Sequence, residues 1–340
     1  MKQSFKIIVF LILFAAVSTC IAQDPPSTQK SDMSTARKSH SSCTLEGKIY
    51  VIGGKNTSST FKSMEVYDPV ADSWDITKSG MNEERVNFTA SVFNGNIFAI
   101  AGSRTMSSNP VSEIEVYDPL TNTWTHKTDM PLARIGSTVS QVNGKFYIFG
   151  GSAANLFLVG TVDVYDPVAD AWTTAENLPT PRINLSSVVL DGKIYVIGGT
   201  FGSANGFLGL DIVEAFDPVT NTWETKAGLN TTRKNFTACV LNGMIYVFGG
   251  SNLDCDGILS SVEAYDPSTN TWINKTPMPS ILGGPSVSVI NGKAYIIGGS
   301  LAACPASPVA SVYEYDPSLD PEPTSIEALG WGLIKVLMQR

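Results

Sequence analysis

The chain has 340 residues, of which only 16% are charged, while 29 are glycine and 19 are proline. This composition favours many short strands joined by tight turns, and the aromatic and β-branched content excludes a chain that is disordered throughout. If residues 1–22 are removed, as argued below, two of the 23 basic residues are lost and all 31 acidic residues remain. The resulting net charge of about −10 argues against nucleic acid or an anionic lipid surface as a partner.

The N-terminus has the pattern of a secretory signal peptide. Lys2 and Lys6 precede an unbroken apolar run from Ile7 to Val17, and small residues follow at Cys20-Ile21-Ala22. We expect residues 1–22 to be removed, which would place the protein outside the cell, or in the periplasm of a bacterium. A lipid anchor at Cys20 is an alternative, but Thr19, the residue before it, fits a lipidation site less well. The apolar run is too short to span a bilayer, and no later stretch predicts a transmembrane helix.

Three motifs recur in phase six times along the rest of the chain. The first is a Gly-Gly or Ala-Gly pair, spaced by 48 to 51 residues, at Gly53/Gly54, Ala101/Gly102, Gly150/Gly151, Gly198/Gly199, Gly249/Gly250 and Gly298/Gly299. The second is an aromatic residue before Asp-Pro, at Tyr67, Tyr117, Tyr165, Phe216, Tyr265 and Tyr315. The third is a tryptophan seven residues after that aromatic residue, at Trp74, Trp124, Trp172, Trp223 and Trp272, whereas the sixth repeat has Glu322.

Each repeat predicts four antiparallel strands. In the third repeat, Asn143-Gly144 joins the first two strands, because both positions of this hairpin turn require a positive φ. Such sheets cannot bury both faces alone, so they stack radially into a propeller. We therefore expect an all-β, six-bladed β-propeller over residues 23–318. Its units span about 33–80, 81–129, 130–177, 178–228, 229–277 and 278–318, and residues 319–340 form a C-terminal tail.

These motifs resemble the Kelch-repeat family. The second-strand run from Lys193 to Gly199, with the spaced Tyr-Asp-Pro and Trp residues, carries the resemblance, which extends over roughly residues 33–317. It implies a propeller of four-stranded blades, and it implies little about activity because this scaffold carries unrelated functions.

The sixth repeat lacks its tryptophan strand, and the N-terminus supplies a match for one. Gln29-Lys30-Ser31-Asp32-Met33 resembles the ends of the fourth strands at 77–81 and 126–130. We therefore predict that residues 26–32 complete the sixth blade and close the ring, which removes exposed sheet edges. The alternative is local completion by residues 324–329.

The loops sort onto two faces because strand direction alternates. Hairpin turns and Asp-Pro turns share one face, and the joins between blades share the other with the loops between second and third strands, where variable sequence favours recognition. Five arginines recur nine residues before the hairpin turns, at Arg37, Arg85, Arg134, Arg182 and Arg233. They either form local structural pairs or make a cationic ring that binds a carboxylate, and the Kelch resemblance favours the ring.

Apolar residues stand in the variable loops of the third and fourth repeats, with Phe157 and Phe207 as the most prominent. They either fold back onto their own blades or form an apolar rim for a protein partner. Candidate glycosylation sites in the chain are Asn56, Asn230 and Asn274, because each begins a sequon. Sequons at Asn87, Asn184 and Asn235 fall at the start of inner strands, where the asparagines are better explained as polar residues of the channel.

Four cysteines remain after cleavage. Cys255 and Cys304 each follow the second glycine of neighbouring repeats by five residues, which predicts a disulfide in an oxidising compartment. Cys43 and Cys239 occupy the same inner-strand position in repeats that are not adjacent, so we expect two buried thiols. The two histidines, His40 and His126, should not converge, and no ligand set predicts a metal or another cofactor.

The sequence thus favours a secreted module that binds a protein, peptide or glycan on the face with the variable loops. The alternative is an epimerase or mutarotase for acidic sugars, in which the arginine ring would hold the carboxylate and an acid such as Glu84 would transfer protons.

Overall fold

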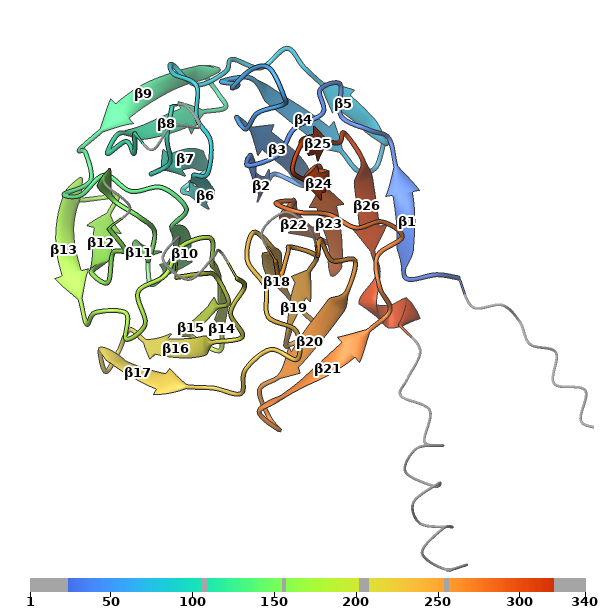
Figure 1. Cartoon of the computed structure of the whole chain (residues 1–340). Helices are drawn as coiled ribbons and strands as arrows, with labels where there is room; N and C mark the ends of the chain where they lie inside the picture. The colour runs from blue at the N-terminus through green and yellow to red at the C-terminus, as the bar shows by residue number, and fades with distance from the viewer. Residues whose placement is uncertain (1–23, 105–108, 155–156, 202–207, 254–256, 321–340) are drawn as a thin grey trace, which may run out of the picture.

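The protein is a ring of six four-stranded antiparallel sheets around a central axis (Figure 1), as seen in a computed structural model that describes residues 24–104, 109–154, 157–201, 208–253 and 257–320. The predicted six-bladed β-propeller is therefore confirmed. The first strand of each blade lies nearest the axis and the fourth lies at the rim (Figure 1).

Blades one to five each use four consecutive strands. Blade one contains β2 (Ser41–Leu45), β3 (Lys48–Ile52), β4 (Met64–Asp68) and β5 (Ser73–Asp75). Blade two contains β6 (Thr89–Phe93), β7 (Asn96–Ile100), β8 (Ile114–Asp118) and β9 (Thr123–Lys127). Blade three contains β10 (Thr138–Val142), β11 (Lys145–Phe149), β12 (Val162–Asp166) and β13 (Ala171–Ala175). Blade four contains β14 (Ser186–Leu190), β15 (Lys193–Ile197), β16 (Val213–Asp217) and β17 (Thr222–Thr225). Blade five contains β18 (Thr237–Leu241), β19 (Met244–Phe248), β20 (Val262–Asp266) and β21 (Thr271–Lys275).

Blade six is assembled from both ends of the propeller. It contains β22 (Ser286–Ile290), β23 (Lys293–Ile297), β26 (Val312–Tyr315) and, as its outermost strand, β1 (Ser27–Lys30). Strands β1 and β26 pair antiparallel, from Ser27 opposite Tyr315 to Lys30 opposite Val312. This is the closure that the N-terminal sequence match predicts, and the alternative segment at 324–329 lies outside the described residues. The loop between β23 and β26 adds a small hairpin of β24 (Ser300–Ala303) and β25 (Ala306–Pro308).

The repeated Asp-Pro turns also join neighbouring blades. Asp72 accepts the backbone N–H of Ser31 at 2.9 Å, and the Trp74 indole donates to the Ser31 carbonyl at 2.9 Å. Equivalent bonds from the turn residue to the preceding blade occur at Asn122, Asp170, Asn221, Asn270 and Asp320. Asp320 is buried and belongs to this set, so it packs with the blades although it falls within the predicted tail of residues 319–340.

The core lies between adjacent blades, where second strands are buried on both faces. One apolar cluster joins Tyr50 and Ile52 of blade one to Ile97, Ala99 and Tyr117 of blade two. Because each cluster needs two blades, no blade buries its core alone, which is the physical reason for a closed ring. Within the described residues, no helix has the length and apolar character that crossing a membrane requires.

Candidate functional site

The variable face is the side of the ring that carries the joins between blades and the loops from second to third strands. Each join leads into an inner strand, and an arginine precedes that strand in five of the six blades, so residues near the axis and residues of the long loops share this side. The opposite face carries the hairpin and Asp-Pro turns, where four single apolar residues, Val70, Leu120, Val168 and Val219, are 78% to 93% exposed.

The five recurring arginines are buried and paired with carboxylates of their own blades. Their relative exposure is 0% to 2%. Arg37 and Arg182 contact Glu65 and Glu214 at 2.5 Å, and Arg85 lies 3.6 Å from Glu115. The remaining two pairs are Arg134 with Asp163 and Arg233 with Glu263.

These arginines also form hydrogen bonds with the Gly-Gly or Ala-Gly pairs at the ends of the second strands, which we call the glycine corners. The guanidinium of Arg37 donates to the Gly53 carbonyl at 2.8 Å, and the Arg37 carbonyl accepts the N–H of Gly299 in blade six at 2.9 Å. Arg85, Arg134, Arg182 and Arg233 make the equivalent guanidinium bond in their own blades and accept the equivalent glycine N–H from the preceding blade. Burial lowers the pKa of each guanidinium, and the adjacent carboxylate opposes that shift.

The prediction that Arg37, Arg85, Arg134, Arg182 and Arg233 form a ligand-binding ring is therefore wrong. A guanidinium that is fully buried against its own carboxylate cannot reach a ligand at the channel, and separating the pair would leave a desolvated charge. The structural interpretation, in which each arginine pairs locally, is the one that the contacts show.

Sequence reasoning missed the acidic partners, although a signal for them exists. Each stands two residues before the Tyr or Phe of the Asp-Pro motif in five blades. In the sixth blade the arginine position is Leu282 and the acid position is Tyr313, so both members of the pair are replaced together. Such joint replacement within one chain is what a contacting pair predicts.

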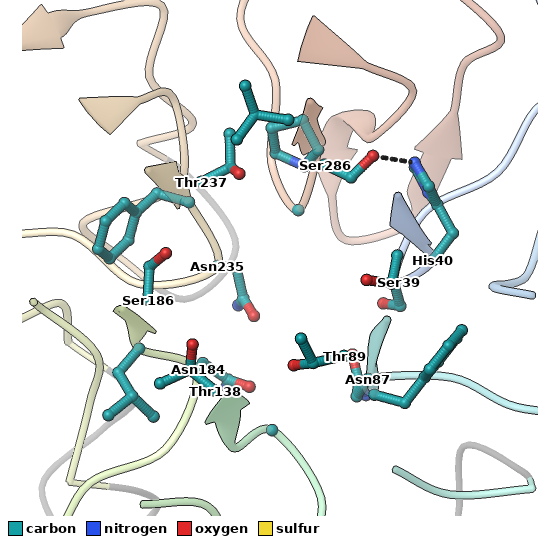
Figure 2. Close-up of a pocket in the computed structure, with 18 of the residues that line it drawn as sticks. Ser39, His40, Asn87, Thr89, Thr138, Asn184, Ser186, Asn235, Thr237 and Ser286 are labelled. Atoms are coloured by element: carbon teal, nitrogen blue, oxygen red, sulfur yellow. Dashed lines mark hydrogen bonds between the residues drawn. The ribbon is translucent and has the colours of Figure 1, made fainter. Parts of the chain in front are cut away.

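A central cavity of about 210 Å³ lies where the six inner strands begin. Figure 2 shows hydroxyl and amide groups that surround it from every blade, including Thr89, Asn184, Ser186 and Asn235. We call the outermost layer the mouth ring, and it consists of Ser39, Asn87, Gly136, Asn184, Asn235 and Gly284. Asn87, Asn184 and Asn235, which the sequence predicts to be polar residues of the channel, therefore line this cavity.

The mouth ring is held by backbone hydrogen bonds from blade to blade. All six residues have φ between 50° and 67°, a left-handed conformation that Asn and Gly tolerate best. Successive N–H groups donate to the preceding member: Asn87 to Ser39, Gly136 to Asn87, Asn184 to Gly136, Asn235 to Asn184 and Gly284 to Asn235, at 2.7 to 3.2 Å. Of the six seams, all within the described residues, only that between Gly284 and Ser39 lacks this bond.

The cavity is uncharged. No Lys, Arg, Asp or Glu is among the described residues that line it. Burial, aided by the charge of Arg37, lowers the pKa of His40 to about 3, so its ring is neutral. His40 contacts the Ser286 hydroxyl at 2.9 Å (Figure 2), but such a weak base cannot activate a serine at neutral pH. The described residues that line the cavity can donate and accept hydrogen bonds.

An apolar groove opens on the variable face between blades two and three. It is lined by Pro110 from the loop of blade two, Leu132 from the join, and Ala153 and Phe157 from the loop of blade three. Phe157 is 67% exposed, so it does not fold back onto its blade. Phe207, the corresponding prediction in blade four, lies outside the described residues, while Phe201 and Leu208 on either side of that gap are exposed.

The other predicted residues lie away from the cavity. Cys43 and Cys239 are free and buried, as expected. Cys304 is disulfide-bonded, whereas Cys255 lies outside the described residues, so the pairing between them stays a prediction. Asn230 and Asn274 are exposed and contact each other at 3.2 Å, and Asn56 is half-buried. Within the described residues, no group of three or more potential ligands could hold a metal ion.

Comparison with known proteins agrees with this architecture. The chain is 27% identical over 131 residues to beta-scruin of Limulus polyphemus and 30% identical over 136 residues to Kelch-like protein 15 of Danio rerio. These matches cover 37% and 34% of the chain but only 14% and 22% of those relatives. Among solved structures, that of YjhT has a TM-score of 0.72 at 17% identity, covers 83% of this chain and 95% of its own, and shows the fold alone.

The family models match most of the propeller. The model of the KLHDC2/KLHL20/DRC7 Kelch-repeats domain matches residues 11–151 and 125–299, and the Kelch motif matches residues 282–320. The recurring glycine corners, Asp-Pro turns and tryptophans are the residues on which the blades are built. The chain therefore belongs to the Kelch-repeat family.

Proposed function

We propose that this chain is a secreted binding module whose protein or peptide ligand contacts the variable face at the mouth ring and the apolar groove. Kelch-repeat propellers typically mediate protein binding. The observation that carries the proposal is the combination of a neutral hydrogen-bonding cavity with an exposed Phe157 on the same face. Backbone amides need hydrogen-bond partners and apolar side chains need an apolar contact, and this surface offers both.

A glycan is the second ligand class that the cavity favours. Its hydroxyl and amide groups match the hydrogen-bonding pattern of a neutral sugar. The apolar groove has no role in that interpretation, so its exposed phenylalanine favours a peptide.

The epimerase or mutarotase alternative has no support in this geometry. The arginines that would hold the carboxylate of an acidic sugar are buried and already paired. Glu84 is exposed on a join and is not among the residues that line the cavity.

Two substitutions in blade three test which face of the ring binds the ligand. Phe157→Asp changes the variable face, and Val168→Asp introduces the same charge at a similarly exposed position on the opposite face. Peptide and glycan arrays probed with the purified protein should give ligands whose binding weakens about tenfold or more with Phe157→Asp, since a buried apolar contact is replaced by a charge. Binding to Val168→Asp should equal that of the wild type.

The mouth ring needs a variant that preserves its backbone. Asn184→Gly removes the amide but keeps the left-handed conformation, because blades three and six already have glycine there. It should weaken the same ligands with little change in melting temperature. Binding that is lost with Val168→Asp but kept with both Phe157→Asp and Asn184→Gly would overturn the proposal.

A further inference from the structure

The seam between blades six and one is the place at which the ring closes. At the other five seams the chain runs directly from the fourth strand of one blade to the first strand of the next. At this seam the chain passes through β1, which is held to β26 by non-covalent contacts. The mouth-ring bond between Ser39 and Gly284 is also missing here. The side-chain contacts near the axis therefore decide whether this seam stays closed.

A histidine stands at this seam where the other blades have residues that do not titrate. The residue after each mouth-ring position is, in chain order, His40, Phe88, Ser137, Leu185, Phe236 and Pro285. A Cβ built on Gly298 of blade six would lie 2.8 Å from His40 Cε1, and one built on Gly53 would lie 2.8 Å from Phe88. His40 thus packs against the glycine corner of the preceding blade as Phe88 does, but its ring can take up a proton.

The ring of His40 is enclosed by neutral groups of blade six. The residue is 7% exposed, and its Nε2 lies 2.9 Å from the hydroxyl of Ser286 on β22 (Figure 2). Its Nδ1 is buried without a hydrogen-bond partner. A proton added to this ring would therefore create a buried cation with little to stabilise it.

The charged groups around His40 are cations. Arg37 acts on the ring from the join, and the guanidinium of Arg37 is already paired with Glu65. Lys38 and Lys55 bridge through their backbones beside Gly54, which lies against His40. Among the described residues that line the cavity, none is acidic, so a protonated His40 would gain no carboxylate there.

These surroundings favour the neutral ring as long as the seam is closed. Burial and then the charge of Arg37 lower the pKa of His40 from 6.5 to about 3, and the backbone of Ile297 opposes this shift as the smallest of the three effects. Water at an opened seam would restore the ordinary pKa. The open form therefore binds a proton that the closed form does not. Closure is strongest above pH 6.5 and weakens as the pH falls below that value.

We infer that His40 makes the seam between blades six and one an acid-sensitive latch, which is closed while the imidazole is neutral and opens as the imidazole takes up a proton. The latch is a property of the propeller itself and goes beyond the proposed binding function, because it needs no ligand. The mouth ring is completed at this seam, so opening would also disrupt the central cavity.

Glu314 is a second titratable group at the closure, and it acts in a different pH range. It accepts hydrogen bonds from Tyr295 at 2.7 Å and Lys293 at 2.9 Å, and it lies 3.2 Å from Lys30 of β1. Burial would raise the pKa of Glu314, but these three donors outweigh burial and hold it below 4.5. Glu314 therefore weakens the closure only as the pH falls below that value. Measurements between pH 7 and pH 5 isolate the histidine.

Hydrogen exchange of the full-length protein at pH 7 and pH 5 tests the latch. After correction for the intrinsic exchange rates, protection of the amides in β1 and β22 should fall about twentyfold at pH 5, as expected for one imidazole that is protonated only when the seam is open. Protection in β14, on the far side of the ring, should change much less. In His40→Phe the acid-dependent loss at β1 and β22 should disappear, because the phenyl ring cannot take up a proton.

Two further variants support the comparison. Phe88 and Phe236 occupy the same place in other blades, so His40→Phe keeps the packing but leaves the Ser286 hydroxyl without its partner. The double substitution His40→Phe and Ser286→Ala removes that hydroxyl and should likewise lack the acid response. The matched control is His126→Phe, which removes a histidine whose side chain is 55% exposed and should leave the acid response unchanged.

Each of three results would overturn the inference. One is equal protection of β1 and β22 at the two pH values in the wild type. Another is an acid response that persists in both His40 variants or disappears in His126→Phe. The last is a loss of protection in β14 as large as that in β1, because acid would then unfold the whole ring rather than open this seam.

Discussion

At the scale of single residues, the buried arginines determine how each blade is held to the next. Arg134 donates to the carbonyls of Gly150 and Thr161 and pairs with Asp163, so one guanidinium satisfies a corner and a neighbouring strand. Its own carbonyl accepts the N–H of Gly102 in blade two. Both ends of the residue therefore have structural partners.

We expect Arg134→Ala to destabilise the protein by about 3–5 kcal/mol, because it leaves the Asp163 carboxylate buried without a partner. Arg104→Ala should cost at most about 1 kcal/mol, since the Arg104 side chain is 50% exposed beside Glu113. Denaturant unfolding of both variants measures the difference.

A second pair of substitutions tests the origin of that loss. Arg134→Leu combined with Asp163→Tyr reproduces the pair that blade six has at Leu282 and Tyr313. The double variant should be more stable than Arg134→Leu alone, because no unpaired charge remains. An unchanged stability of Arg134→Ala would contradict the scaffold role.

At the scale of secondary structure, β1 is the element on which the ring depends for closure. It pairs with β26 over four residues, and Lys30 lies 3.2 Å from Glu314. In the segment that follows β1, the Ser31 backbone N–H donates a hydrogen bond to Asp72 of blade one, and the Ser31 carbonyl accepts one from Trp74. One short strand thus completes blade six and forms the seam with the first blade.

Deletion of residues 23–32 should lower the stability of the propeller by several kcal/mol, since each lost hydrogen bond costs about 1 kcal/mol and the edge of β26 becomes exposed. Deletion of residues 330–340, which lie outside the described part, is the comparison and should have a smaller effect. Thermal melting of the two truncated proteins decides between them. The reverse order of stabilities would mean that the C-terminal segment closes the ring.

At the scale of the whole molecule, the ring is a rigid support on which loop residues vary. A TM-score of 0.72 to YjhT at 17% identity shows that the blades keep their arrangement while most side chains differ. The positions that vary among the six blades here, such as Lys55 and Phe157, lie on the variable face. Recognition on such a scaffold is set by a few side chains rather than by the fold.

Secretion is a prediction about the whole chain, and one mass-spectrometric experiment tests it. Protein recovered from the medium of expressing cells should begin at Gln23, and non-reducing peptide mapping should link Cys255 to Cys304. This disulfide would close a loop of about 50 residues and stabilise the fold by up to about 4 kcal/mol. An uncleaved N-terminus with both thiols free would contradict the secreted location.

The sequence by itself determined the number of blades and the turns, and it favoured the N-terminal strand as the one that completes the sixth blade. These features depend on local requirements that residue type reveals, such as the positive φ at Asn143 and Gly144, or on a recurring phase such as that of the tryptophans. The same phase located the arginines and the asparagines of the mouth ring.

Only the tertiary structure decided what these side chains contact. Arg37 pairs with Glu65, which lies 28 residues away on another strand. Because of such pairing, the arginines that were predicted to bind a ligand have a structural role instead. Lys38 and Lys55 become neighbours because the glycine corner folds back onto the join. Spacing along the chain gives the phase of a side chain, but its partners, burial and charge depend on segments that approach one another only when the ring has closed.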